Sequence, residues 1–511
     1  MPVTLGEALT IEDVVAIARG DTAVVSDAAR VRVAAARAVV ERKLAAGDVV
    51  YGVTTGFGSL ANVHLQPDEA RALQIALLRS HAVAVGDSLS EWETRAMLAL
   101  RAHVLALGYS GVRQEIVDRL ILLLNQSVLP IVPEQGSLGA SGDLAPLAHL
   151  ALPLVGEGEV SFEGDRMPAG DALARLAVEP LTLEAKEGLA LINGTQGMLA
   201  VGILAAERAQ ALAKAADVTA AMTTEAILGT DAAFDERIMR LRPHAGQAAS
   251  ASNLRRLLAG SGIVASHHDS EHLVQDAYSI RCAPQVHGAF RDTLAHATGV
   301  FETEMGSVSD NPLVFADDDL VVSGGNFHGQ PVAVACDTLA LATVGLASIS
   351  ERRLYRLLDP ATNNGLPAFL IEPSGVNSGF MIVQYTAASI VSESKSLAHP
   401  ASVDSIPSSA GQEDHVSMGM IAARHAREVI RNAEVVVAFE ALAAAQALDL
   451  RERSTGAPPA VGTAAAREAI RGIAAFLDAD RPLKAELDEA IELVESGELL
   501  RAVEAAVGAL D

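Results

Sequence analysis

The sequence has 511 residues, and its 38 Lys and Arg against 64 Asp and Glu give a formal net charge of −26. A chain this acidic repels polyanions, so a nucleic-acid partner is not expected. Half of the residues are hydrophobic and 20% are charged, which favours a large folded core over disorder.

The cellular compartment is indicated by three features. The two cysteines, Cys282 and Cys336, cannot form a disulfide framework. The N-terminal residues lack a basic segment followed by an apolar one, so no secretory signal is expected. The apolar stretches 144–155 and 435–448 contain polar residues and are shorter than the roughly 18 residues that cross a membrane. We expect a cytoplasmic protein with no membrane partner.

Helix caps punctuate the first 130 residues. Thr10-Ile-Glu-Asp13 resembles a capping box, and residues 27–46 form a longer helical pattern that Gly47 ends. Ser90 opens another helix, and apolar residues recur at helical spacing over 114–124. The sequence therefore predicts four or five helices in this region.

Longer apolar segments follow, and they contain few helix breakers. These segments are too long for strands and predict long helices, partly buried on several faces. They span 181–227, 285–304, 331–358, 380–397 and 435–448. We expect a mainly α-helical fold.

Strand signals are few. Residues 157–165 predict a hairpin with a Gly-Asp turn, and 320–323 predict a short strand. The segment 451–462 is typical of a linker, with two or three short helices after it. We expect three regions, 1–200, 201–450 and 451–511, in one continuous body.

Small residues are densest in Gly136-Ser-Leu-Gly-Ala140-Ser141-Gly142-Asp143. This segment could be a tight loop that Asp143 caps, and it lacks the GK[ST] ending of a phosphate-binding loop. It could also modify itself, because the Gly142 nitrogen can attack the Ala140 carbonyl and the Ser141 hydroxyl can leave as water. Both interpretations remain open from these residues alone.

A second glycine-rich stretch begins at Tyr51. Residues 56–61 match GxGxxG/A, but no alternating strand–helix pattern follows, so a dinucleotide site is disfavoured. A loop that presents Tyr51 is the better interpretation, since a phenol can act as a general base.

Other polar clusters interrupt apolar sequence. His268-Asp-Ser-Glu271-His272 matches a zinc-ligand spacing, but no third ligand is visible and we expect no metal. Arg281 could bind a carboxylate through its guanidinium fork. The remaining clusters are 192–196, 275–281, 309–313, 324–329 and 412–415, each of which could be an ordinary turn or cap.

Together and in this order, the motifs resemble those of the aromatic amino acid ammonia-lyases. They are Tyr51-Gly-Val-Thr-Thr-Gly-Phe-Gly, Gly136-Ser-Leu-Gly-Ala-Ser-Gly-Asp, Leu191-Ile-Asn-Gly-Thr-Gln, segments 275–281, 309–313 and 324–329, and Gln412-Glu-Asp-His-Val-Ser-Met. The resemblance covers about residues 5–500. It implies a long-helix bundle of the ammonia-lyase type, with a smaller N-terminal region that carries the active-site loops, and a homotetramer with shared active sites.

The resemblance also implies a cofactor and roles for residues. The electrophile 4-methylidene-imidazol-5-one (MIO) would form autocatalytically from Ala140, Ser141 and Gly142, with no external cofactor. Tyr51 resembles the base that removes the β-proton of the substrate. Groups that bind the substrate carboxylate or support the MIO are Asn193, Gln275 and Arg281, and active-site wall residues are Tyr278 and Phe327.

Two places bear on the substrate. Ser80-His81 occupies a pair that is Phe-Leu or His-Leu in phenylalanine and tyrosine lyases, and Glu413 matches the carboxylate that histidine-specific members place near the imidazole. A carboxylate suits an imidazole and would be a buried unpaired charge beside a phenyl ring. The implied reaction is the deamination of L-histidine to trans-urocanate and ammonia.

Two alternatives are retained. One is a lyase or 2,3-aminomutase for phenylalanine or tyrosine, which would use the same catalytic residues with different loop closure. The other is a catalytically silent helical scaffold, because a fold alone does not fix function. Such a scaffold would be expected to lose Ser141 or Tyr51, and both are present.

Overall fold

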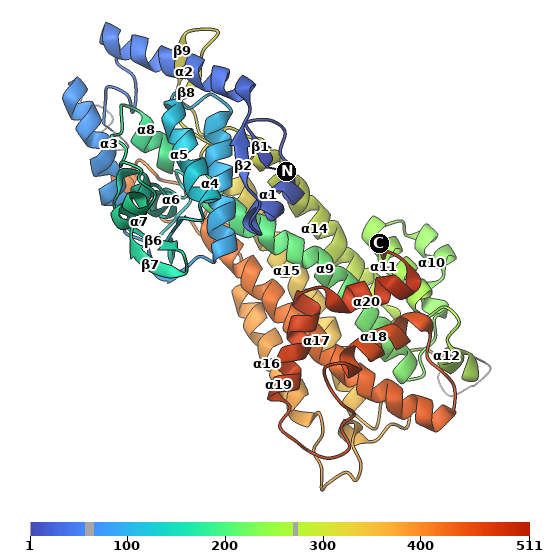
Figure 1. Ribbon diagram of the computed structural model, residues 1–511. Helices are drawn as coiled ribbons and strands as arrows, with labels where there is room; N and C mark the ends of the chain where they lie inside the picture. The colour runs from blue at the N-terminus through green and yellow to red at the C-terminus, as the bar shows by residue number, and fades with distance from the viewer. Residues whose placement is uncertain (1, 57–65, 269–273) are drawn as a thin grey trace. The chain divides into compact units, whose positions relative to one another are not determined.

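The computed structural model describes residues 2–56, 66–268 and 274–511 (Figure 1). The chain divides into two compact units, each assembled from segments that are separate in the sequence. The first unit comprises Met1–Leu204, Thr298–Asp337 and Pro400–Arg424, and the second comprises Ala205–Ala297, Thr338–His399 and His425–Asp511.

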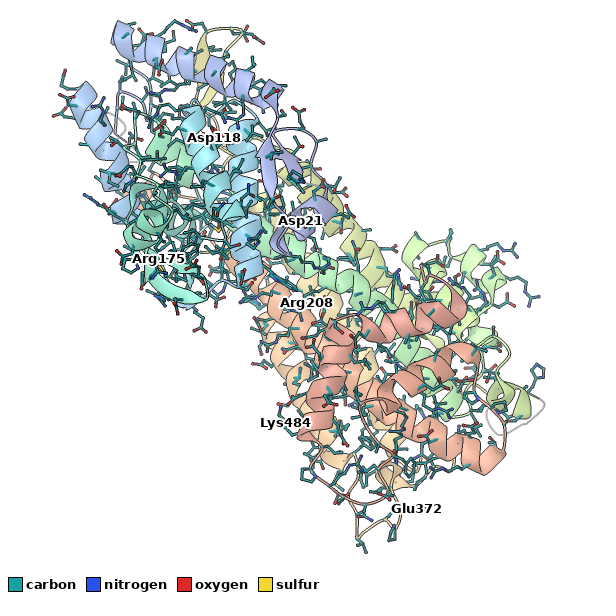
Figure 2. The ribbon with its side chains drawn as sticks, in the orientation of Figure 1. Asp21, Asp118, Arg175, Arg208, Glu372 and Lys484 are labelled. Atoms are coloured by element: carbon teal, nitrogen blue, oxygen red, sulfur yellow. The ribbon has the colours of Figure 1, made fainter. Side chains whose placement is uncertain are left out.

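The predicted N-terminal helices are confirmed. Thr10 and Ser90 each cap a helix through a capping box, and Gly47 ends the second helix at φ 71°. On the second helix, Arg30 pairs with Asp118 of the fifth at 2.9 Å (Figure 2). The helices of the first 130 residues are α1 (Ile11–Ala18), α2 (Asp27–Ala46), α3 (Pro67–His81), α4 (Glu91–Ala106) and α5 (Gln114–Asn125), and α6 (Leu144–Ala151), α7 (Ala169–Arg175) and α8 (Glu187–Ile192) follow them.

Strands are short and form four small sheets within the described residues. The predicted hairpin is present, but its turn is Glu163-Gly164, and Asp165 already belongs to the second strand. The pairs are β1 (Val3–Leu5) with β2 (Ala23–Val25), β3 (Val85–Ser88) with β5 (Pro133–Gln135), β4 (Leu129–Pro130) with β6 (Glu159–Phe162), β6 with β7 (Asp165–Pro168), and β8 (Leu313–Phe315) with β9 (Leu320–Val322).

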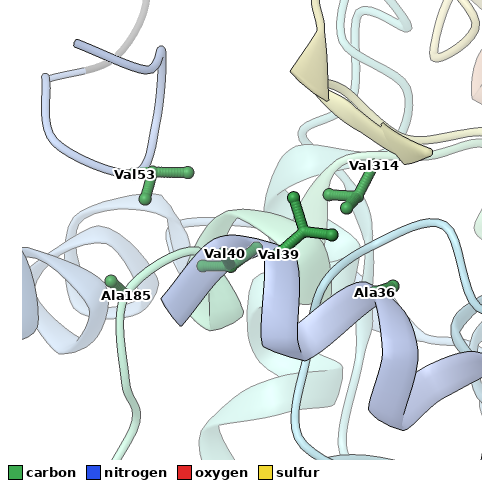
Figure 3. Packing of buried hydrophobic residues seen from close by; sticks show 6 residues of the cluster. All are labelled: Ala36, Val39, Val40, Val53, Ala185 and Val314. Atoms are coloured by element: carbon green, nitrogen blue, oxygen red, sulfur yellow. The ribbon is translucent and has the colours of Figure 1, made fainter. Parts of the chain in front are cut away.

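A small apolar cluster in the first unit ties the Tyr51 loop to its surroundings (Figure 3). Val39 and Val40 on α2 meet Val314 of β8, and Val53 enters the same cluster from the loop. All four side chains are almost completely buried. The base of the loop is therefore anchored by hydrophobic burial two residues from Tyr51.

The long helices are present with two corrections. The expected helix 181–227 begins only at Glu187 and is broken at Asn193-Gly194-Thr195, and the expected linker at 451–462 begins late because α17 continues to Thr455. The first break accompanies the close contact of Gly194 with Gly142, and at the second position Arg451 continues α17 while donating hydrogen bonds to the Ala226 and Asn363 carbonyls. The long helices are α9 (Gln196–Ala226), α14 (Ala283–Met305), α15 (Gln330–Leu358), α16 (Met381–Leu397) and α17 (Gly419–Thr455).

Shorter helices complete the second unit. Arg208 of α9 forms ion pairs there with Glu434 of α17 and Glu495 of α19 (Figure 2). The shorter helices are α10 (Glu236–Leu241), α11 (Ala245–Leu257), α12 (Gly262–Ser266), α13 (Tyr278–Arg281), α18 (Val461–Arg471), α19 (Lys484–Glu495) and α20 (Glu498–Val507). The last three are the short C-terminal helices that the sequence predicted.

One helix differs from the expectation about membrane spans. Within the described ranges, α15 alone is long and apolar enough to cross a membrane by length and composition. However, 61% of its most apolar window is buried inside the protein, as in the core helix of a folded domain.

Candidate active site

The Ala140-Ser141-Gly142 loop lies between β5 and α6 and is held against Gly194. Gly142 adopts φ +73°, and a Cβ built on it would lie 2.0 Å from the Gly194 carbonyl oxygen. That oxygen also accepts a hydrogen bond from the Asp143 N–H at 2.7 Å. Only glycine fits this left-handed, crowded position. The Asn-Gly-Thr break between α8 and α9 thus serves the loop.

Two further polar clusters meet the loop at its start. The Gly139 carbonyl accepts hydrogen bonds from the Ser417 hydroxyl at 3.0 Å and from the Gly329 N–H at 3.3 Å. A Cβ on Gly139, which has φ +75°, would lie 2.1 Å from Ser417 Oγ. The segments 136–143, 324–329 and 412–418, which the sequence singled out separately, therefore converge in the first unit.

Asp143 fixes the end of the loop to the first turn of α9. It is fully buried, and its carboxylate accepts hydrogen bonds from the Met198 N–H at 2.7 Å and the Ser137 hydroxyl at 2.9 Å. A carboxylate at a helix N-terminus is electrostatically favourable. Burial nevertheless raises the pKa of Asp143 to about 6, against the opposing effect of those hydrogen bonds.

Glu413 reaches the centre of the loop. Its Oε1 accepts a hydrogen bond from the Ser141 hydroxyl at 3.0 Å, and its Oε2 accepts one from the Ser408 hydroxyl at 2.8 Å. Two backbone hydrogen bonds between residues 408 and 413 close the turn. The carboxylate is thus held by both oxygens beside the residue that the resemblance assigns to MIO formation.

Asn193 lies at the C-terminal end of α8 and is almost fully buried. Its Nδ2 donates to Asp310 Oδ1 at 3.3 Å and to the Asn311 carbonyl at 3.1 Å. The guanidinium of Arg101 donates to the Asn193 carbonyl at 3.2 Å. Asp310 and Asn311 therefore hold the side chain of Asn193, and Arg101 holds its backbone carbonyl.

Tyr51 is half-buried in a turn at the edge of the described residues. Within this turn the Thr54 hydroxyl accepts a hydrogen bond from the Val50 N–H at 2.9 Å, and the Thr55 hydroxyl accepts one from the Gly52 N–H at 3.2 Å. The two threonines therefore stabilise the turn that carries the phenol. The GxGxxG/A match at 56–61 lies almost wholly outside the described residues.

Ser80 and His81 end α3 and turn back onto its last turn. The Ser80 hydroxyl donates to the Leu77 carbonyl at 3.0 Å, and His81 Nδ1 lies 2.9 Å from the same oxygen. A carbonyl oxygen can only accept, so Nδ1 of His81 is the donor in this contact. Phe327 is half-buried in the 324–329 segment, whose His328 ring stacks on that of His415 at 5.9 Å.

Three expected site residues belong to the second unit. Gln275 and Tyr278 are exposed, with Tyr278 71% accessible. The Arg281 guanidinium carbon lies 4.6 Å from the centre of the Tyr278 ring, a cation–π contact. Their roles stay predictions.

The zinc-like motif falls largely on residues outside the described ranges, since Glu271 and His272 are among them. In the part of the chain that the structure describes, no group of three or more His, Cys, Asp or Glu side chains is arranged to hold a metal.

The residues present fit an MIO group. Such a ring needs a short loop with an accessible Gly nitrogen and a small residue ahead of Ser. Gly142 is held in the left-handed conformation, and the Ala140 side chain is buried. Ala140, Ser141 and Gly142 would hold the group, and it would supply an electrophile for an amine.

Sequence reasoning missed two charged residues near Asn193, Lys186 and Arg101, and it noted Asp310 only as part of the 309–313 cluster. Lys186 and Asp310 are both fully buried and pair at 2.8 Å. Arg101 is also fully buried, and burial lowers its pKa to about 10, so it stays a cation near neutral pH. The 309–313 cluster was the signal that could have indicated this network, since it contains Asp310.

Comparison with known proteins gives the family. The model for aromatic amino acid lyases matches residues 9–472, and the chain belongs to this family of carbon–nitrogen lyases. Among curated relatives, the histidine ammonia-lyase of Sorangium cellulosum is 53% identical over 99% of this chain and 100% of its own length. That of Gloeobacter violaceus is 54% identical over 99% of this chain and 98% of its own length.

Solved structures agree on the fold. The histidine ammonia-lyase of Trypanosoma cruzi is 43% identical, with a TM-score of 0.91 over 99% of this chain and 96% of its own. The tyrosine aminomutase of Streptomyces globisporus is 38% identical, with a TM-score of 0.95 over all of both chains. The mainly α-helical, long-helix fold of these lyases is thus confirmed. Because proteins named for different reactions share it, the fold does not choose the substrate.

Proposed function

We propose that this chain removes ammonia from L-histidine without oxidation and releases trans-urocanate, the first step of histidine degradation. The observation that carries the proposal is the Glu413 carboxylate, 3.0 Å from the Ser141 hydroxyl. A carboxylate there is a strong acceptor for an imidazole N–H and would be costly beside a phenyl ring. The high identity to histidine ammonia-lyases over almost the full chain supports the same substrate.

The electrophile would come from the loop itself, as aromatic amino acid lyases in general depend on MIO. The Gly142 nitrogen bonds to the Ala140 carbonyl carbon, and the Ala140 oxygen leaves as water with the amide hydrogens of Ser141 and Gly142. A second water takes the Ser141 hydroxyl and the Ser141 Cα hydrogen. The balance needs no oxidant, reductant or external cofactor.

The other residues address the rest of the reaction. The β-proton of an amino acid is weakly acidic, so a positioned base is needed, and Tyr51 is assigned to it. Ser80, His81 and Glu413 surround the imidazole, while Tyr278 and Phe327 form the wall. Asn193, Gln275 and Arg281 hold the α-amino acid end.

The setting of the reaction is also proposed. The enzyme works in the cytoplasm as a homotetramer whose subunits share active sites. The net charge of −26 supports small-molecule work without a nucleic-acid or membrane partner.

The test is ultraviolet absorbance with parallel ammonia detection after the purified protein is mixed with L-histidine, L-phenylalanine or L-tyrosine. Urocanate and ammonia from histidine alone are expected. Cinnamate or coumarate would instead indicate a phenylalanine or tyrosine lyase. A β-amino acid without free ammonia would indicate a 2,3-aminomutase. Silence with all three would favour the inactive scaffold.

A further inference from the structure

The orientation of the Asn193 amide is fixed by the chemistry of its neighbours. Nδ2 faces Asp310 Oδ1 at 3.3 Å and the Asn311 carbonyl at 3.1 Å. A carboxylate and a carbonyl can only accept, so the amide nitrogen must lie on this side whichever way the two amide atoms are assigned. Both N–H groups of the side chain therefore donate to Asp310 and Asn311, and we call this side inward.

The acceptor that holds this amide is itself locked. Asp310 Oδ2 lies 2.8 Å from Lys186 Nζ, and its Oδ1 also accepts the Asn311 N–H at 2.6 Å. Both side chains of the pair are completely buried, so each compensates a charge that would otherwise be very costly. Burial lowers the pKa of Lys186, and the negative charge of Asp310 opposes that shift.

The backbone at this ion pair is also unusual. Lys186 adopts φ +77°, a left-handed conformation that residues with a Cβ disfavour. It directly precedes α8, which ends at Asn193. The surrounding packing holds Lys186 where its ammonium can reach Asp310. Asp310 therefore contacts the residue before α8, Lys186, and the residue after it, Asn193.

Within the described residues, no group donates a hydrogen bond to Asn193 Oδ1. We propose that Lys186 and Asp310 are positioning residues that keep Nδ2 of Asn193 inward, so that Asn193 offers a ligand Oδ1 alone and binds the α-ammonium group of the substrate. A carbonyl oxygen attracts an ammonium and repels a carboxylate. Carboxylate recognition then falls to a cationic group other than Asn193. This inference rests on the proposed function and sharpens the role of Asn193 within it.

Two analogues of histidine separate the two possible partners of Asn193. Histamine keeps the ammonium and lacks the carboxylate, whereas deaminohistidine keeps the carboxylate and lacks the ammonium. Their dissociation constants are measured by calorimetry on the full-length protein and on Asp310→Asn. In this variant the new amide can donate a hydrogen bond, so the side-chain amide of Asn193 can flip and place Oδ1 inward. Histamine should bind about tenfold more weakly to the variant, the loss expected for one charge-assisted hydrogen bond, with deaminohistidine unchanged.

Three variants guard against a general loss of structure. Lys186→Met, which removes the counter-ion of Asp310, should give the same split, and Lys186→Arg should restore histamine binding. Glu434→Gln removes another buried, paired carboxylate, in the second unit, and should lower stability while leaving both affinities unchanged. Intact mass shows in each case whether the Ala140–Gly142 loop has lost its two waters.

Loss of affinity for deaminohistidine, equal loss for both analogues, or unchanged histamine affinity would overturn the proposal. If Asp310→Asn does not fold, the Lys186 pair decides by the same criteria. Histidine turnover by the unaltered protein is measured in the same preparation. A failure of the proposed function would appear there, whereas a failure of this inference would appear in the analogue affinities.

Discussion

The Ser141 hydroxyl and the Glu413 carboxylate share a hydrogen bond of 3.0 Å, although the two residues lie in segments far apart in the sequence. The second Glu413 oxygen is held by Ser408 at 2.8 Å, so the carboxylate has a defined position. If it accepts the imidazole N–H of histidine, the amide of Glu413→Gln should bind that group less strongly. We expect histidine turnover to fall by about 10- to 100-fold, since a hydrogen bond to a charged group contributes roughly 1.5–3 kcal/mol.

The matched control is Asp414→Asn, which removes the same charge from the exposed neighbouring residue. It should leave turnover within about twofold, because a solvated charge contributes little. Intact mass should show the loss of two waters in both variants. Unchanged histidine kinetics in Glu413→Gln would end the assignment of Glu413 to the imidazole.

Gly142→Ala should block the self-modification of the loop. The new Cβ would meet the Gly194 carbonyl oxygen at 2.0 Å, in a backbone conformation with φ +73°. Intact mass should then lack the decrease of two waters, about 36 Da, that MIO formation predicts for the unaltered chain. We also expect a free energy of unfolding lower by about 1–3 kcal/mol.

Gly164→Ala is the control for that substitution. Gly164 has φ +87° in the β6–β7 turn, and nothing lies within 4 Å of a Cβ built there. This variant carries a similar backbone penalty without the collision, so it should show the same decrease of two waters, relative to its own calculated mass, as the unaltered protein does. If Gly142→Ala also lost two waters, the close approach of Gly142 to Gly194 would be contradicted.

Tyr51→Phe tests the proposed base. Removing a general base typically costs about 10²- to 10⁴-fold in rate, so kcat should fall by that order while the mass decrease of two waters remains. Tyr109→Phe serves as the control, because the Tyr109 ring packs edge-on against Phe315 at 5.9 Å, outside the assigned site. Equal losses in the two variants, or none in Tyr51→Phe, would remove Tyr51 from the reaction.

Asp143 predicts a specific pH dependence of stability. Its pKa rises from 3.8 to about 6 on folding, so the folded state holds the proton more tightly than the unfolded state does. The stabilisation from the protonated carboxyl is complete below pH 3.8 and is lost as the pH rises through about 6. It amounts to about 3 kcal/mol at most.

The measurement compares the free energy of unfolding of the unaltered protein with that of Asp143→Asn from pH 4 to pH 8. The difference should change by up to that amount between about pH 4 and pH 6 and should be level above about pH 7. If the unaltered protein instead became more stable relative to Asp143→Asn as the pH rises from about 4 to about 6, hydrogen bonding would outweigh burial in setting the pKa of Asp143.

Local signals predicted local structure well. The caps at Thr10 and Ser90 act on backbone N–H groups within three residues, so the sequence was sufficient to place the starts of α1 and α4. The break at Asn193 was not predicted, because the apolar pattern continues on both sides of it. Its cause is the contact between Gly194 and Gly142, which no local pattern encodes.

The amino-acid sequence by itself determined the helical class, several capped helix ends and the ordered motifs that resemble the ammonia-lyases, because these depend on neighbours within a few residues. Only the tertiary structure decided that Glu413 meets Ser141 and that Lys186 and Asp310 orient Asn193. These contacts join segments far apart in the chain. Their geometry follows from how buried helices and loops pack, which no periodicity or spacing along the sequence specifies.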